Sequence, residues 1–174
     1  MIYLTHHLLR DSARRCPDKE AVVHGDERVS FATLDSRTTA LAAALLGAGL
    51  GRSERVGIFL EKTLPEVYAL FAVWKAGGVA VPISDKLFPE QVGHIAQDCG
   101  VTVLVTTRAR LESLGEVIAQ TTTLKAIFLA DGDLDGLELP GSVKAISLPA
   151  ALENPSATPV VDRCVSNDMG AFLY

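Results

Sequence analysis

Two segments of the chain carry residue types that bind phosphate or metal ions in other proteins. The first, Gly47-Ala48-Gly49-Leu50-Gly51, has the glycine content of a dinucleotide-binding loop. Such a loop follows a strand and opens a helix, so that a phosphate meets the helix amides. These glycines instead follow a predicted helix and precede a strand. We therefore interpret them as a helix end and linker.

The second segment, Asp131–Gly136, matches the first half of a calcium-binding loop. That loop needs a bidentate glutamate at its twelfth position, and Ser142 stands there instead. Leu139-Pro140-Gly141 also prevents an exit helix at that point. The segment therefore predicts a solvent-exposed acidic turn.

The histidines and cysteines form no pattern that is typical of a metal or catalytic site. The four histidines include no i, i+4 pair and no nearby carboxylate of a known motif, so we interpret them as ordinary, partly exposed side chains. The three cysteines are far apart and odd in number, which favours reduced thiols. These residues are His6, His7, His24 and His94, with Cys16, Cys99 and Cys164. The sequence predicts no metal site, and no catalytic residue within the chain.

Composition excludes several classes of protein. The chain has 174 residues, a net charge of −5 and 48% hydrophobic residues, which describes about one globular domain. The acidic balance argues against nucleic-acid binding. The start of the chain, Met1–His7, lacks a secretory signal, and with the reduced thiols this predicts a cytoplasmic protein. The apolar runs at 40–50 and 67–83 are interrupted by glycine, lysine or proline, so no membrane span is expected.

The first part of the chain predicts a helix and a hairpin. Residues 4–16 read as a short helix that ends before Pro17. Two short apolar runs flank Gly25-Asp26-Glu27, which predicts a β-hairpin. Ser30 is placed to cap a helix that starts at Phe31 and ends in the glycines after Leu46.

A strand–helix unit then recurs. Residues 55–60 predict a strand, and Thr63-Leu64-Pro65-Glu66 reads as the capping box of a helix that ends at Gly77. The apolar face of that helix is predicted to comprise Val67, Leu70, Phe71 and Trp74. Further strands are expected at 79–83, 101–105 and 126–129 with amphipathic helices between them, and one more at 145–148. This alternation predicts a three-layer α/β/α, Rossmann-like fold with a mostly parallel sheet and an N-terminal hairpin.

Four segments, in order, resemble the adenylate-forming enzymes. Trp74–Ile83 (WKAGGVAVPI) is similar to the family's second core motif, L-K-A-G-x-x-x-V-P-I/L. Val29–Leu34 resembles the first, L-[ST]-Y-x-E-L, with Thr33 in place of the glutamate. Pro89–Thr106 resembles the helix and V-L-V-T strand that follow. Asp168–Tyr174 resembles the strand that leads into the third motif, T-S-G-S-T-G-x-P-K-G.

This resemblance implies the N-terminal part of an AMP-forming acyl-CoA synthetase. Such an enzyme uses ATP and Mg²⁺ to convert a carboxylic acid into an acyl-adenylate, and transfers the acyl group to CoA. The family's phosphate loop, metal-binding motif and catalytic lysine would lie beyond Tyr174, so we expect this chain alone to be inactive and to bind none of these ligands tightly. A nonribosomal-peptide-type adenylation domain and a non-catalytic α/β binding module stay open as alternatives.

The same resemblance implies candidate cofactor-binding residues and a domain division. In some acyl-CoA synthetases two loops contact the phosphates of CoA, and here those loops carry Lys86, Arg108 and Arg110. Cations suit these phosphates, although solvated surface charges are the simpler interpretation. Within residues 1–174 we expect a helix and hairpin at 1–31, repeated α/β units at 32–150, a connection at 151–167 and a truncated strand at 168–174. An open sheet edge predicts that the chain self-associates.

Overall fold

The computed structural model describes residues 4–139, 141–153 and 157–174. The expectations that fall on Met1–Tyr3, on Pro140 and on 154–156 of the predicted connection lie outside the described residues. Among the helices of the described part, none is both long and apolar enough to cross a lipid bilayer.

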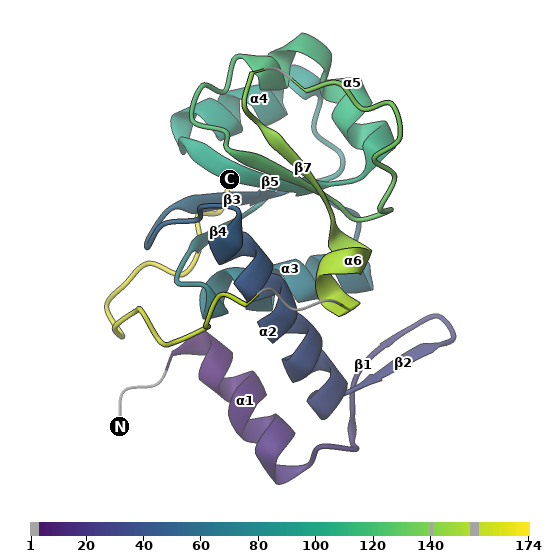
Figure 1. Cartoon of the computed structure of the whole chain (residues 1–174), viewed down its shortest axis with the longest axis vertical. Coiled ribbons are helices and arrows are strands. Elements are labelled where there is room, and N and C mark those ends of the chain that lie inside the picture. The colour runs from purple at the N-terminus through teal and green to yellow at the C-terminus, as the bar shows by residue number, and fades with distance from the viewer. Residues whose placement is uncertain (1–3, 140, 154–156) are drawn as a thin grey trace.

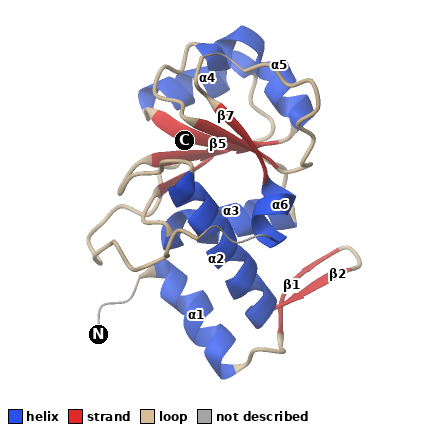
Figure 2. Ribbon diagram, viewed as in Figure 1, coloured by secondary structure: helices blue, strands red, loops and turns tan. Residues whose placement is uncertain are grey.

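The centre of the fold is a parallel sheet of five strands (Figure 2). Its order is β4-β3-β5-β6-β7, so the chain passes from β3 outward to β4 and then returns past β3 to β5. Buried residues run along β5 and β6 without alternation, as expected for strands that are covered on both faces. The strands are β3 (Arg55–Ile58), β4 (Val79–Pro82), β5 (Val101–Thr106), β6 (Ala126–Leu129) and β7 (Lys144–Ser147).

Helices cover both faces of the sheet, which confirms the expected three layers (Figure 1). One face carries α2 (Phe31–Gly47), α3 (Leu64–Lys75) and the short α6 (Leu148–Glu153). The other carries α4 (Pro89–Asp98) and α5 (Arg108–Ala119). A separate apolar core fills each interface; Val56 and Phe128 point into the first core, and Leu104 and Ile127 into the second.

The N-terminal elements follow the sequence prediction closely. Helix α1 (Thr5–Arg15) packs beside α2, and β1 (Glu20–His24) pairs antiparallel with β2 (Glu27–Ser30). The Ser30 side chain accepts a 3.2 Å hydrogen bond from Thr33 N and so caps α2, as its position predicted. The hairpin projects away from the sheet (Figure 1).

The start of α3 differs from the prediction. The Thr63 hydroxyl donates to the Glu61 carbonyl at 3.2 Å, and Glu66 N donates to the Thr63 carbonyl instead of the side chain. The Glu66 carboxylate pairs with Lys62 at 2.8 Å. Both side chains of the predicted capping box are therefore engaged elsewhere, and the expected box does not form.

The most buried side of α3 is not the predicted one. Residues opposite the expected face, including Tyr68, Ala72 and Val73, are buried, while all four residues of the expected face are only partly buried and pack against the core. Helix α3 packs against the sheet and against α1 and α2, so several sides of it are covered. Trp74 contacts the core as expected, and its indole N–H also donates to the Gly170 carbonyl at 2.8 Å.

The C-terminal third contains a helix that the sequence analysis did not predict. Strand β7 runs directly into α6, which occupies the beginning of the expected connection; Ala150 N donates to the Ser147 side chain at 3.3 Å in its first turn. Of the expected strand at 168–174, the structure shows a single parallel bridge between Ala171 and Ala80. That bridge extends the sheet beyond β4.

Candidate functional site

The carboxyl ends of the parallel strands gather most of the candidate polar residues. Strand β3 leads to Glu61, β4 to Asp85, β5 to Thr107 and β6 to Asp131. Ligands of open α/β sheets bind at this edge, beyond the carboxyl ends of the strands. A cavity of about 480 Å³ opens here between the sheet edge, the start of α3 and the hairpin.

Arg110 lies in the first turn of α5 and is held by three groups. Its guanidinium donates to Glu61 Oε1 at 3.0 Å and to the Asp85 carbonyl at 3.3 Å, and it lies over the Phe59 ring at 4.9 Å from the centroid. The side chain is 19% exposed. These contacts tie the loops after β3 and β4 to α5, so Arg110 organises this edge of the sheet.

Lys86 lies beside Arg110 and is much more accessible. Its ammonium is 3.2 Å from Asp85 Oδ2, and the same carboxylate lies 3.8 Å from the Arg110 guanidinium. The Lys86 side chain is 85% exposed. The structure therefore brings Lys86 and Arg110 together around Asp85, with Lys86 facing solvent.

Arg108 engages a separate set of acidic groups. Its Nε donates to Glu112 Oε1 at 2.6 Å, and Nη1 donates to the Asp135 carbonyl at 3.0 Å. The hydrogen bond with Glu112 raises the pKa of the guanidinium. The backbone N of Arg108 donates to Asp131 Oδ2 at 2.7 Å. The acidic turn that resembled a calcium loop is thus used, in part, to hold the start of α5.

Among the described residues, no set of free backbone amides is available at this edge to bind the phosphates of a nucleoside triphosphate. The first amides of α5 are already occupied, since Arg108 N binds Asp131 and Arg110 N binds the Thr107 hydroxyl at 3.4 Å. Glycine-rich loops supply free amides to phosphate, and none precedes a helix in this part of the chain. The nearby carboxylates of Glu61 and Asp85 pair with Arg110 or Lys86. These residues therefore do not fit an ATP–Mg²⁺ site by themselves.

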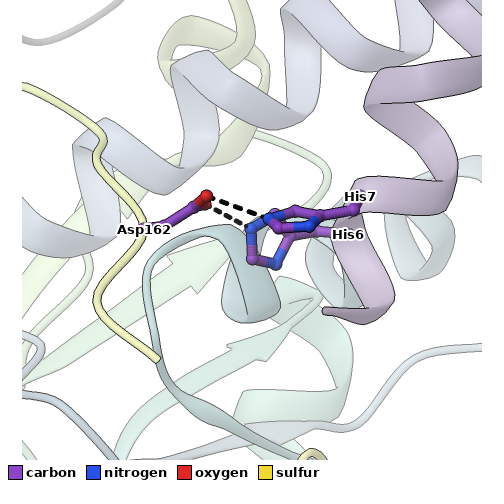
Figure 3. A group of neighbouring side chains, drawn as sticks. All are labelled: His6, His7 and Asp162. Atoms are coloured by element: carbon purple, nitrogen blue, oxygen red, sulfur yellow. Dashed lines mark hydrogen bonds and ion pairs between the residues drawn. The ribbon is translucent and has the colours of Figure 1, made fainter. Parts of the chain in front are cut away.

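A second polar cluster lies at the first turn of α1 (Figure 3), and α1 lies on the other side of the sheet from α4 and α5 (Figure 1). His6 Nε2 is 2.8 Å from Asp162 Oδ1, and His7 Nε2 is 2.9 Å from Asp162 Oδ2. Arg10 Nη1 donates to the same carboxylate at 3.2 Å. The expectation of ordinary, partly exposed histidines without a carboxylate partner is therefore wrong for His6, whose side chain is only 6% exposed. His7 is partly exposed as expected, at 12%, but it too has a carboxylate partner.

Burial and charge act against each other in this cluster. Burial raises the pKa of the Asp162 carboxyl, but hydrogen bonds from His6, His7 and Arg10 outweigh it and hold that pKa at about 2. Burial also lowers the pKa of His6, although its hydrogen bond to Asp162 opposes this. The sequence contains only the adjacent histidines as a hint, because their partner lies 155 residues beyond His7.

The structure leaves the cysteines as free thiols, as expected. Cys164 lies near the ion pair that Arg52 makes with Asp168 at 2.7 Å. Burial raises the pKa of its thiol, and Asp168 adds to that effect.

Comparison with known proteins identifies close relatives. The family model described as "AMP-binding enzyme" matches residues 9–174. N-(5-amino-5-carboxypentanoyl)-L-cysteinyl-D-valine synthase of Streptomyces clavuligerus is 38% identical over 140 residues, which is 75% of this chain and 17% of that protein. Tyrocidine synthase 1 of Brevibacillus parabrevis is 34% identical over 104 residues, 60% of this chain and 10% of its own length.

Solved structures of the same fold include an acid ligase. Coronafacic acid ligase from Pectobacterium brasiliense superposes with a TM-score of 0.87 at 20% identity, over 99% of this chain and 33% of that one. At this identity the likeness shows the fold alone. This chain spans less than a fifth of the length of the curated relatives named above and about a third of the ligase.

Proposed function

Because this chain belongs to the AMP-binding enzyme family, we propose that it forms the first part of the large domain of an acid–thiol ligase. Such an enzyme activates a carboxylate with ATP as an acyl-adenylate and passes the acyl group to CoA. A carboxylate is a poor electrophile, and an AMP leaving group makes its carbonyl carbon reactive toward a thiol. The family match over residues 9–174 is the observation that carries the proposal.

The role of this part of the chain is to build one side of the site and to meet the acceptor. Lys86 is the most accessible cation of the three candidates for a phosphate of CoA, because its side chain is 85% exposed and, among the described residues, its one ion pair is with Asp85 at 3.2 Å. Arg108 and Arg110 would have to exchange protein acceptors for phosphate oxygens. Guanidinium groups make such exchanges readily, since phosphate and carboxylate accept the same bidentate donors.

A second candidate is an adenylation domain of a peptide synthetase, which would load an amino acid onto a carrier-protein thiol. The specific observation in its favour is the 38% identity to the Streptomyces clavuligerus synthase. The two candidates share the adenylation step. They differ in the thiol acceptor, so the acceptor must be tested separately.

The test uses the longest polypeptide that contains these residues. Pyrophosphate exchange with a panel of fatty, aromatic and amino acids measures adenylation, and product analysis with CoA or a phosphopantetheinylated carrier protein identifies the acceptor. We expect exchange with at least one acid and thioester formation with CoA. Absence of exchange with every acid would overturn the proposed function, and thioester formed only on the carrier would favour the second candidate.

The substitution Lys86→Ala tests the acceptor contact within that enzyme. Loss of one phosphate contact should raise the apparent KM for CoA about tenfold, equivalent to ~1.4 kcal/mol, and leave pyrophosphate exchange unchanged. Lys144→Ala is the matched control, because Lys144 is exposed at the amino end of β7, the opposite edge of the sheet. An unchanged CoA response in Lys86→Ala would remove this assignment.

A further inference from the structure

We propose that His6, His7 and Asp162 bind a divalent transition-metal ion, with Zn²⁺ the best match to their donors. One ligand atom from each residue lies within 4.8 Å of the others, and among the described residues this is the one such group of three (Figure 3). Zinc–ligand bonds of about 2.0–2.2 Å place ligand atoms roughly 3.3 Å apart. Small rotations of these side chains therefore suffice to enclose an ion.

The arrangement of the two histidines supports this inference. Successive residues of a helix point about 100° apart, so adjacent side chains normally diverge. Here the His6 and His7 rings lie nearly perpendicular, at 87°, with centroids 4.7 Å apart, and both Nε2 atoms aim at one carboxylate. One hydrogen bond would be enough to anchor the start of α1. Two imidazole nitrogens that are directed at the same place supply two ligands for a metal ion.

The chemistry of the donors points to zinc. Two imidazoles and one carboxylate form a common zinc ligand set, in which three protein ligands leave a fourth position for water. Metal binding through Nε2 places the ring proton on Nδ1, and this would break the weak 3.4 Å hydrogen bond from Leu4 N to His7 Nδ1. A cavity of about 200 Å³ that His6 and Asp162 help to line has room for the water.

Arg10 is compatible with an ion at this position. Its guanidinium donates to Asp162 Oδ2 at 3.2 Å, the oxygen that also faces His7, while Oδ1 faces His6 alone of these three side chains and is the oxygen we assign to the metal. The carboxylate then separates the two positive charges, and the hydrogen bond from Arg10 fixes its orientation as outer partners of metal ligands do. The ion would join α1 to the segment at 157–168, which leads to the bridge between Ala171 and Ala80.

Metal titration of the chain tests the proposal. Protein freed of metal by a chelator is titrated with Zn²⁺ against a colorimetric chelator, and Co²⁺ is added separately to record its visible absorption. We expect one ion per chain, an intense tetrahedral Co²⁺ spectrum, and affinity at least about tenfold weaker in His7→Gln and Asp162→Asn. His94→Gln, an exposed histidine on α4, is the control and should bind as the parent does.

These outcomes distinguish a metal site from a cluster in which His6, His7 and Asp162 only form hydrogen bonds with one another. Equal Zn²⁺ affinity in His7→Gln and the parent, or an octahedral Co²⁺ spectrum, would overturn the proposal. If circular dichroism shows that a variant fails to fold, NMR of the histidine ring signals in the parent protein tests the metal site instead. Zn²⁺ should then shift the ring signals of His6 and His7 and leave those of His24 and His94 in place, and the opposite pattern would refute the site.

Discussion

Lys75 is a charged side chain in the interior whose donors are all used. Its ammonium is 2.7 Å from the Asp35 carbonyl, 2.7 Å from Asp35 Oδ1 and 2.8 Å from the Thr39 hydroxyl, and the residue is 5% exposed. Burial lowers the pKa of Lys75, and the hydrogen bond to Asp35 opposes that effect. The lysine of the second core motif therefore joins α3 to α2, which is a structural task.

We expect Lys75→Met to lower the free energy of unfolding by about 2 kcal/mol, because a charged partner is removed and the acceptors on α2 lose their donor. Chemical denaturation monitored by circular dichroism measures the change. Lys62→Met is the control: Lys62 pairs with Glu66 but is 87% exposed, so about 0.5 kcal/mol or less is expected. Equal stability of Lys75→Met and the parent would show that the hydrogen bonds of Lys75 to α2 contribute nothing to the free energy of unfolding.

Glu54 gives a pH-dependent contribution at the residue scale. Its carboxylate accepts from Gly51 N at 2.8 Å and from Lys125 at 2.7 Å. Burial raises the pKa of Glu54, but these hydrogen bonds lower it by more than burial raises it, so the pKa in the folded state lies below 4.5. The stabilisation is therefore complete above pH 4.5 and is lost as the pH falls through the folded pKa.

We expect Glu54→Gln to cost about 1 kcal/mol at neutral pH, and the deficit to vanish under more acidic conditions. Denaturation of the parent and variant at a series of pH values measures this difference. Glu116→Gln, an exposed carboxylate on α5, serves for comparison. A deficit that stays constant down to pH 3, or that grows on acidification, would contradict the assignment.

At the scale of elements, the end of α3 depends on a glycine. Gly77 has φ +77°, and its neighbour Gly78 N donates to the Val73 carbonyl at 2.9 Å to close the helix. A Cβ at Gly77 would lie 3.3 Å from Arg163 Cβ and from Cys164 Sγ. The end of α3 thus packs closely against Arg163 and Cys164.

Gly77→Ala should destabilise the chain by roughly 1–2 kcal/mol from the left-handed backbone alone, and should also displace residues 163–164. Thermal denaturation measures the first effect, and limited proteolysis near Arg163 the second. Gly25→Ala distinguishes the backbone effect from the packing effect, because Gly25 also has positive φ but a Cβ there would meet open space. Proteolysis that is no faster in Gly77→Ala than in Gly25→Ala would contradict the packing argument.

At the scale of the whole molecule, the sheet edge near β4 carries exposed apolar side chains. The bridge at Ala171 covers β4 at a single position, and several large side chains around it face solvent. They are Val165, Met169, Leu173 and Tyr174, each more than half exposed. Open strand edges and apolar patches favour association with another chain.

We therefore predict that the chain self-associates as its concentration rises, as measured by sedimentation velocity. Leu173→Glu should weaken the association, because a charge would be buried at the contact. Val23→Glu, at an exposed apolar residue of the hairpin, should leave it unchanged. A monomer at every concentration would refute this prediction.

Local sequence pattern by itself determined most of the elements and the fold class, with α6 and the expected strand at 168–174 as exceptions. Ser30 caps α2, Gly77 follows the end of α3 with positive φ, and continuous apolar strands sit between amphipathic helices, all as predicted. These features depend on residues within a few positions of one another. The family motifs were also readable, because they are contiguous stretches.

Only the tertiary structure decided which distant residues meet. The strand order β4-β3-β5, the partner of Lys75 on α2, and the meeting of His6 and His7 with Asp162 all join parts of the chain that no local pattern connects. The capping box at Thr63 failed for a different reason, because Thr63 and Glu66 bind local partners, Glu61 and Lys62, instead of each other. Periodicity specifies which side of an element is apolar, but contacts across the chain depend on how the elements pack in three dimensions.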